Sequence, residues 1–290
     1  MIARDLFASR PAPVSALASV QDAAPASASG ARTVAASIGA ALAAFVACAP
    51  AYAVLPDEIQ VYIDDLNDPG KFGLELHVNT TPSGRSTPDY PGEITPAHGL
   101  RVTPEFSYGV TPSLEAGAYI PSEFVPGGGW ELAGGKLRLK WVPLRASDEG
   151  GFFAGLNGEL SSVARRFEID QRGLEIRPIF GWRDRAWLFA TNPVFDVALS
   201  GPDRSKAPDF QPSFKVSREV GGGIAAGFEY YSDLGPVGSF DSSSQQQHTL
   251  FLALDVDRKP WACNIGVGRG LTNATDRWTV KAIFEIPIDE

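Results

Sequence analysis

The chain is poor in cysteine and histidine: its 290 residues include only two cysteines and three histidines. Cys48 falls in an apolar N-terminal run, and Cys263 is alone in the remainder, which therefore has no partner for an intramolecular disulfide. No spacing of His, Cys and carboxylate residues is typical of a metal site, so the sequence indicates no metal and no cofactor. We interpret His77, His98 and His248 as ordinary surface residues.

Two further absences exclude broad classes of protein. No stretch after residue 53 contains 18 consecutive apolar residues, so the sequence predicts no transmembrane helix there. The formal net charge of −9 argues against a nucleic-acid-binding protein. By contrast, the chain is rich in glycine and proline, with 30 and 23 residues respectively, and its mean hydropathy is near zero. This composition suits many strands that are joined by turns and carry a polar residue at every second position.

The N-terminus has the features of an export signal. Arg32 precedes an apolar run over 33–49, and Ala51-Tyr52-Ala53 follows as an A-x-A cleavage signature. We therefore predict a signal peptide over 1–53 with cleavage after Ala53, and its unusual length suggests a start codon assigned too early. The alternatives are a lipoprotein box ending at Cys48 and a buried core helix over 33–49.

The remainder of the chain alternates apolar and polar residues with a period of two. In the last such segment one face is wholly apolar and the other carries Lys281 and Glu285. Twelve segments of bilayer-crossing length follow residue 70: 71–80, 99–110, 113–121, 130–142, 151–164, 173–183, 186–199, 209–218, 223–233, 248–256, 262–271 and 277–288. In a membrane, the backbone groups at the edge of an open sheet have no water to pair with. The twelve segments therefore predict a closed antiparallel transmembrane β-barrel over 71–290, an up-and-down meander of about 12 strands.

The connections and the first acidic stretch complete this organisation. Residues 54–70 are predicted as a periplasmic N-terminal segment, either a short strand or a plug at the lower rim of the barrel. For this stretch we favour a solvated acidic turn over a calcium site. The long connections at 81–98 and 234–247 are predicted to face outward, whereas the short ones at 111–112 and 184–185 face inward.

The polar strand faces carry the residues predicted to line the lumen. They hold seven basic and seven acidic side chains: Glu75, Arg101, Glu105, Glu115, Lys136, Arg138, Lys140, Glu159, Glu175, Arg177, Lys215, Glu229, Lys281 and Glu285. Two interpretations remain open. One is a selective channel with a basic ladder at Lys136, Arg138 and Lys140, and the other is a salt-bridged filling of a narrow barrel. The balance of charges argues against strong ion selectivity of the whole lumen.

Two motifs that suggest other chemistry are weak. The alternating glycines of 266–270 look like a phosphate loop, but no helix follows them, which favours close packing of a side chain or of the N-terminal segment. Neither Ser107 nor Ser161 has a spacing to a histidine that suggests a catalytic dyad. We therefore predict no catalytic residues and no enzyme activity.

Four stretches carry a resemblance to known proteins: Phe72–Asn79, Val102–Thr111, Leu114–Gly117 and Glu229–Ser232. They resemble a family of uncharacterised proteobacterial outer-membrane β-barrels, which is similar to transporters of the phenol meta-cleavage pathway type. The resemblance implies an exported Gram-negative barrel that passes small hydrophobic or aromatic solutes. The chain departs from many such barrels because it ends in Ile288-Asp289-Glu290 rather than in an aromatic residue.

The pattern favours an outer-membrane barrel that acts as a passive channel or transporter for small solutes. Its expected partners are outer-membrane lipid and lipopolysaccharide, the barrel-assembly machinery and an unidentified small solute, with no nucleic acid, and the barrel is expected to be a monomer. The alternatives are a non-conducting structural or surface-binding barrel and a barrel hydrolase. A soluble periplasmic protein with two packed sheets is the remaining alternative.

Overall fold

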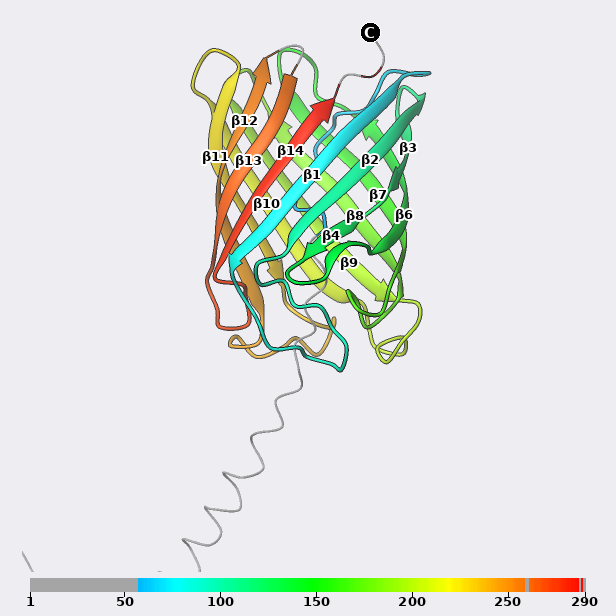
Figure 1. Ribbon diagram of the computed structural model, residues 1–290. Coiled ribbons are helices and arrows are strands. Elements are labelled where there is room, and N and C mark those ends of the chain that lie inside the picture. The colour runs from blue at the N-terminus through cyan, green and yellow to red at the C-terminus, as the bar shows by residue number, and fades with distance from the viewer. Residues whose placement is uncertain (1–56, 259–260, 287, 289–290) are drawn as a thin grey trace, which may run out of the picture. The chain divides into compact units, whose positions relative to one another are not determined.

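The fold is a closed antiparallel β-barrel. The computed structural model describes residues 57–258, 261–286 and 288, and these form fourteen strands and no α-helix. Twelve strands follow one another around the barrel, and pairing of β1 with both β2 and β14 closes it (Figure 1). The predicted closed up-and-down barrel is thus confirmed. The predicted signal peptide over 1–53, its cleavage site and residues 54–56 lie outside the described residues.

The strands of the barrel wall are 6 to 13 residues long. They are β1 (Phe72–Ser83), β2 (Leu100–Thr111), β3 (Leu114–Tyr119), β6 (Gly134–Leu144), β7 (Gly151–Val163), β8 (Arg172–Arg183), β9 (Trp187–Ala198), β10 (Asp209–Glu219), β11 (Ile224–Asp233), β12 (Gln247–Arg258), β13 (Trp261–Gly270) and β14 (Trp278–Ile286). The two remaining strands are β4 (Ser122–Val125) and β5 (Gly129–Leu132).

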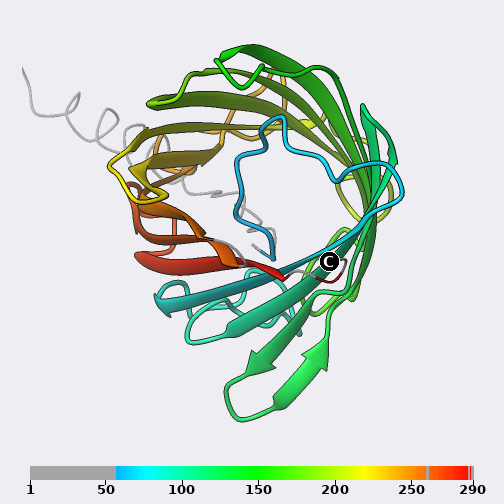
Figure 2. The ribbon, with the colours of Figure 1, turned by 90° about the horizontal axis from the view of Figure 1, so that it is seen from above.

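The strands β4 and β5 form a hairpin that the sequence pattern did not predict. The predicted strand 113–121 corresponds to β3 alone, and β4 lies in the stretch that was predicted as a connection. The predicted strand 130–142 divides at Ala133 into β5 and β6. Pro121 has no N–H to donate, and its carbonyl instead accepts a hydrogen bond from the Ala133 N–H at 2.8 Å. Beyond this point β5 pairs with β4 alone, and the hairpin extends away from the barrel wall (Figure 2).

The outer face of the wall is apolar because side chains alternate between the two faces of a strand. On β6, Leu137 and Leu139 are exposed on the outside, whereas Arg138 and Lys140 are buried on the inside. The same belt continues around the barrel, for example at Leu252, which is 60% exposed at the middle of β12. Such a surface suits contact with lipid. Among the described residues no helix is long and apolar enough to cross a membrane.

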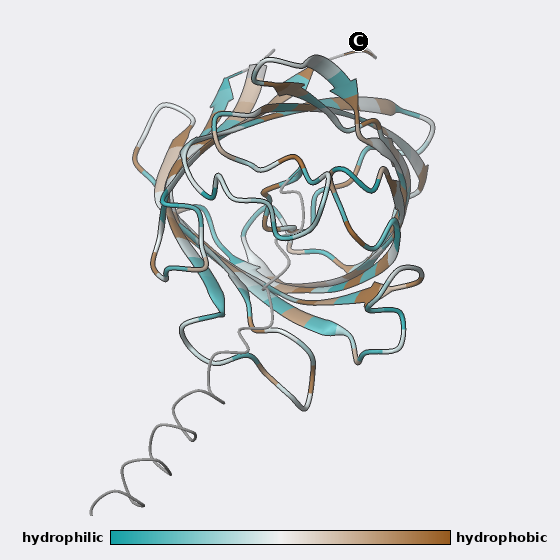
Figure 3. Ribbon diagram, turned by 60° about the horizontal axis from the view of Figure 1, so that its bottom comes forward, coloured by the Kyte–Doolittle hydropathy of each residue, from teal (hydrophilic) through white to brown (hydrophobic). Residues whose placement is uncertain are grey.

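The two ends of the barrel differ in the length of their connections. We call the end with the connections 112–113 and 184–186 the turn end, and there β1 begins and β14 ends. The opposite end, the loop end, carries the long connections 84–99, 199–208 and 234–246 (Figure 3). The connection 84–99 is attached to the connection after β7 by a hydrogen bond, in which the Ile94 N–H donates to the Arg166 carbonyl at 2.7 Å. Aromatic residues such as Trp141 and Trp278 are exposed near strand ends.

We predict that Leu252→Arg lowers the free energy of unfolding by about 2–4 kcal/mol, because it places a charge on the lipid-facing wall near the middle of a strand. Unfolding by guanidinium chloride in lipid vesicles measures this change. The matched control is Val220→Arg, because Val220 is 63% exposed but lies in the connection after β10 rather than in the wall. Equal losses in the two variants would contradict a lipid-facing belt.

Candidate functional site: the barrel lumen

The described part of the N-terminal acidic segment, residues 57–70, runs inside the barrel. It starts toward the loop end, where Asp57 pairs with Lys136 near the beginning of β6. It finishes at the turn end, where the Gly70 N–H donates to the carbonyl of Gly109 on β2 at 2.8 Å. Figure 2 shows this segment within the ring of strands. We call residues 57–70 the lumen segment.

Tyr62 of the lumen segment forms several hydrogen bonds with the barrel wall. Its N–H donates to Asn192 Oδ1 at 2.6 Å, and Asn192 Nδ2 donates to the Tyr62 carbonyl at 3.0 Å, so one side chain from β9 satisfies both backbone groups. The Tyr62 hydroxyl lies 2.6 Å from that of Tyr119 and donates to Glu159 Oε1 at 3.2 Å. The Arg177 guanidinium lies 4.4 Å from the centre of the Tyr62 ring.

Apolar contacts also hold the lumen segment against the wall. Val61 and Tyr62 belong to a buried cluster with Phe153, Ile179 and Ala190, whose side chains point inward from β7, β8 and β9. Ile179 is fully buried although the strands on either side of it carry charged inward residues. The lumen segment is therefore packed against β7, β8 and β9 at this level, through an apolar contact between charged layers.

The carboxylates of the lumen segment neutralise much of the predicted basic ladder. Lys136 Nζ lies 2.9 Å from Asp57 Oδ1, and Lys140 Nζ lies 3.3 Å from Asp65 Oδ1. Arg138, between them on β6, pairs instead with two carboxylates of the wall, Glu105 and Glu115. All three basic side chains are thus ion-paired, an arrangement that resembles the salt-bridged filling more than an open row of positive charge.

The fourteen residues predicted to line the lumen differ in exposure. Nine are buried: Arg101, Glu105, Glu115, Arg138, Lys140, Glu159, Arg177, Glu229 and Lys281. Four are partly buried: Glu75, Lys136, Glu175 and Lys215. Glu285, near the end of β14, is exposed. A second network forms around Glu229, which pairs with Lys215 at 3.2 Å and with Lys281. The role of the fourteen residues as the lining of a conducting path stays a prediction.

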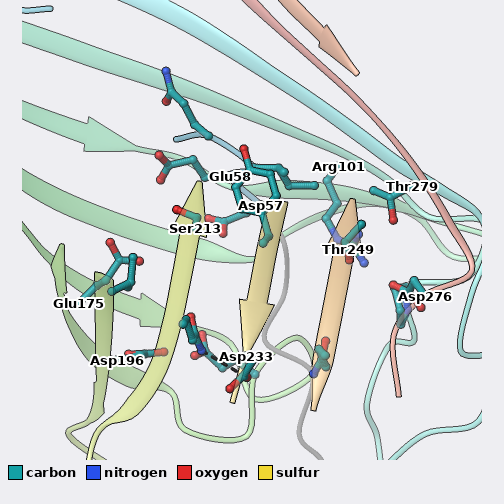
Figure 4. Close-up of a pocket in the computed structure, with 18 of the residues that line it drawn as sticks. Asp57, Glu58, Arg101, Glu175, Asp196, Ser213, Asp233, Thr249, Asp276 and Thr279 are labelled. Carbon is teal, nitrogen blue, oxygen red and sulfur yellow. Dashed lines mark hydrogen bonds between the residues drawn. The ribbon is translucent and has the colours of Figure 1, made fainter. Parts of the chain in front are cut away.

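Toward the loop end the lumen contains a cavity of about 250 Å³. Nine carboxylates and only four basic side chains contribute to its lining. We call it the acidic cavity, and its carboxylates are Asp57, Glu58, Glu93, Glu159, Glu168, Glu175, Asp196, Asp233 and Asp276 (Figure 4). The basic residues are Arg85, Arg101, Lys136 and Arg177. The cavity therefore carries a local excess of negative charge.

Several residues of the acidic cavity were missed by the sequence analysis. Asp196 and Asp233 lie near the loop ends of β9 and β11, whereas Glu168 and Asp276 belong to connections. Inward alternation could have identified Asp196, but no local pattern indicates that the connections fold over the lumen. Asp276 is held there because the Arg85 N–H donates to its Oδ1 at 2.9 Å.

Burial alters the acidity of two carboxyl groups in these connections. Burial raises the pKa of Glu168 to about 8, with Lys136 opposing the shift and Asp196, Asp57 and Asp170 adding to it. Burial also raises the pKa of Asp276 above its usual value, although the Arg85 N–H and Arg101 oppose the shift. The negative charge of the acidic cavity therefore increases as the pH rises through neutrality.

The expectation that His77 is an ordinary surface residue needs correction, and two carboxylates lie beside it. His77 is not a surface residue, because it is fully buried on the inner face of β1. Its Nε2 lies 3.1 Å from Glu105 Oε2, and Glu75, His77 and Glu105 place possible metal-ligating atoms within 4.8 Å of one another. Local spacing missed this cluster because Glu105 is 28 residues from His77 in sequence and only strand register brings them together.

The remaining motifs have ordinary surroundings. His248 Nδ1 lies 2.6 Å from the Tyr230 hydroxyl, and its Nε2 lies 3.2 Å from Gln246 Oε1. The glycines of β13 leave room for a buried aromatic ring, because a Cβ added to Gly268 would lie 2.5 Å from Phe251 Cζ. The Gly-rich stretch therefore serves the packing of a side chain.

Comparisons with known proteins address the fold. No protein-family model matches the sequence, and neither does any curated protein. The structure is similar to an outer-membrane channel from Pseudomonas putida F1, with a TM-score of 0.52, 9% identity, and coverage of 79% of this chain and 99% of that chain. At this identity the likeness shows a shared barrel fold.

Two other solved barrels are also similar. A KdgM porin in complex with disordered oligogalacturonate has a TM-score of 0.46 and 9% identity, and the match covers 75% of this chain and 99% of that one. Outer membrane phospholipase A from Escherichia coli has a TM-score of 0.43 and 10% identity, with 80% and 96% covered.

We predict that Asn192→Leu loosens the lumen segment, because it leaves the N–H and C=O of Tyr62 without their partners in a buried site. Amide hydrogen exchange at Tyr62 should become at least about 5-fold faster, since a loss of about 1–3 kcal/mol corresponds to that factor or more. Asn273→Leu, in an exposed connection, is the control and should leave this exchange unchanged. Unchanged exchange in Asn192→Leu would show that these two hydrogen bonds do not hold Tyr62 in place.

Proposed function

We propose that the protein is an outer-membrane channel for small polar solutes, whose path runs beside the lumen segment and through the acidic cavity. One observation carries this proposal: a closed barrel with an apolar outer belt encloses charged side chains and a cavity of about 250 Å³. An apolar exterior suits lipid, and a charged interior with space for water suits passage of hydrated solutes. The similar barrel from Pseudomonas putida F1 is an outer-membrane channel, which agrees with this function.

The lining of the acidic cavity favours solutes that carry positive charge. Its excess of carboxylates raises the local concentration of cations and lowers that of anions. Two buried groups of the lining also have an atom without a hydrogen-bond partner among the described residues, Oδ2 of Asp57 and a terminal nitrogen of Arg101. These atoms require water or a polar solute. They support small polar solutes over the hydrophobic or aromatic solutes that the sequence resemblance implies.

The remaining parts of the proposal come from the sequence. We infer export through the predicted signal peptide, assembly by the barrel-assembly machinery, contact with outer-membrane lipid and lipopolysaccharide, and a monomeric barrel without enzyme activity. With an even number of strands, both ends of the barrel chain lie at the turn end, which we assign to the periplasm. The acidic cavity then lies on the extracellular side.

We predict weak cation selectivity in planar bilayers, measured as the reversal potential in a KCl gradient. The double variant Asp196→Asn/Asp233→Asn should reduce the ratio of K⁺ to Cl⁻ permeability about threefold, because two charges leave a confined, poorly screened site. The matched control is Asp148→Asn/Glu149→Gln in the exposed turn-end connection. The absence of any conductance would refute the channel and favour a non-conducting structural or surface-binding barrel.

The pKa of Glu168 gives a further test of the path. A carboxyl group with a pKa of about 8 is largely neutral at pH 6 and charged at pH 9, so cation selectivity should increase over this interval. Glu168→Gln removes the titrating group and should flatten the pH profile between 6 and 9. A profile that is the same in the parent protein and in Glu168→Gln would show that solutes do not pass this carboxylate.

A further inference from the structure

We infer that Glu75, His77 and Glu105 form a binding site for a divalent transition-metal ion on the inner wall near the turn end. Strand register places these residues together. Glu75 on β1 lies directly opposite Glu105 on β2 and, on its other side, directly opposite Glu285 on β14. Three carboxylates thus form one row across three neighbouring strands, and His77 follows Glu75 on the same face two residues later.

The distances among the ligating atoms suit a metal ion. His77 Nε2 lies 3.1 Å from Glu105 Oε2 and 3.8 Å from Glu75 Oε2. Zinc binds nitrogen and oxygen ligands at about 2.0–2.2 Å in a tetrahedral arrangement, which separates neighbouring ligand atoms by about 3.4 Å. The three side chains therefore need only small movements to share an ion. They leave a fourth coordination position for water, as in zinc sites with three protein ligands.

The charges around the row also favour a bound cation. Like charges directly opposite each other on neighbouring strands destabilise a sheet. Arg138 pairs with Glu105, but it does so through Oε1 and leaves Oε2 directed to His77. Glu75 accepts a long hydrogen bond from Gln60 Nε2 at 3.5 Å. A divalent ion between Glu75 and Glu105 would supply the positive charge that Arg138 does not bring to Glu75.

The kind of ion follows from the donor set and from access to it. One imidazole with two carboxylates suits Zn²⁺ better than Ca²⁺ or Mg²⁺, which prefer oxygen ligands alone. The Glu75 side chain is 28% exposed, and the exposed Glu285 continues its row toward the turn end. An ion therefore has a route from that end to a site whose other two ligands, His77 and Glu105, are buried.

The test is a titration of Zn²⁺ into the purified, chelator-treated full chain in detergent micelles, followed by calorimetry. We expect one saturable site per chain, and Glu75→Gln and His77→Asn should each weaken it at least about 100-fold by removing a direct ligand. His98→Asn is the matched control, because it removes an exposed histidine from a loop and tolerates the positive φ of 62° at that position. It should retain the parent affinity.

Folding of each variant is checked by heat-modifiable migration on SDS gels. If His77→Asn does not fold, Glu75→Gln carries the test, because Glu75 is partly exposed. The proposal is overturned if the parent chain shows no saturable Zn²⁺ binding, if folded Glu75→Gln binds like the parent, or if His98→Asn loses binding as strongly. Binding is measured without a bilayer, so its outcome is independent of whether the barrel conducts.

Discussion

The pairing of buried charges is the constraint on which the rest of this structure depends. A closed wall with an apolar outside sends its polar residues inward, and burying an unpaired charge in a narrow lumen costs several kcal/mol. The wall alone does not supply every partner. Lys136 and Lys140 on β6 are neutralised by Asp57 and Asp65 of the lumen segment, and Arg183 at the end of β8 pairs with Asp64 at 3.1 Å.

The lumen segment therefore has a structural role and, in the proposed channel, a functional role as well. Its carboxylates stabilise the basic side of the barrel, while Val61 and Tyr62 pack against the wall at Ile179. The acidic cavity lies toward the loop end, and carboxylates outnumber basic side chains in its lining. In the proposed channel, the charge that faces a solute thus depends less on the balanced total of the fourteen predicted lining residues than on which charges the lumen segment leaves unpaired.

The fold could be predicted from the sequence because alternation at period two is a local signal that each strand repeats. The number of barrel strands and most strand positions follow from it, whereas the β4–β5 hairpin after Pro121 does not, because a proline alone does not distinguish a bend from a strand end. The contents of the lumen depend on long-range register. Asn192 meets Tyr62 across 130 residues, and Glu75 meets Glu105 only through the pairing of β1 with β2.

The path of the lumen segment has a consequence for the order of assembly. Lys281 on β14 donates to the carbonyl of Ile59 at 2.8 Å, so the start of the described chain and its last strand share a hydrogen bond across 222 residues. Contacts of such separation form late, because nearly the whole chain must be synthesised and placed first. This contact of the lumen segment is therefore completed together with the seam between β1 and β14, and the hydrogen bond between Lys281 and Ile59 marks a barrel that has finished closing.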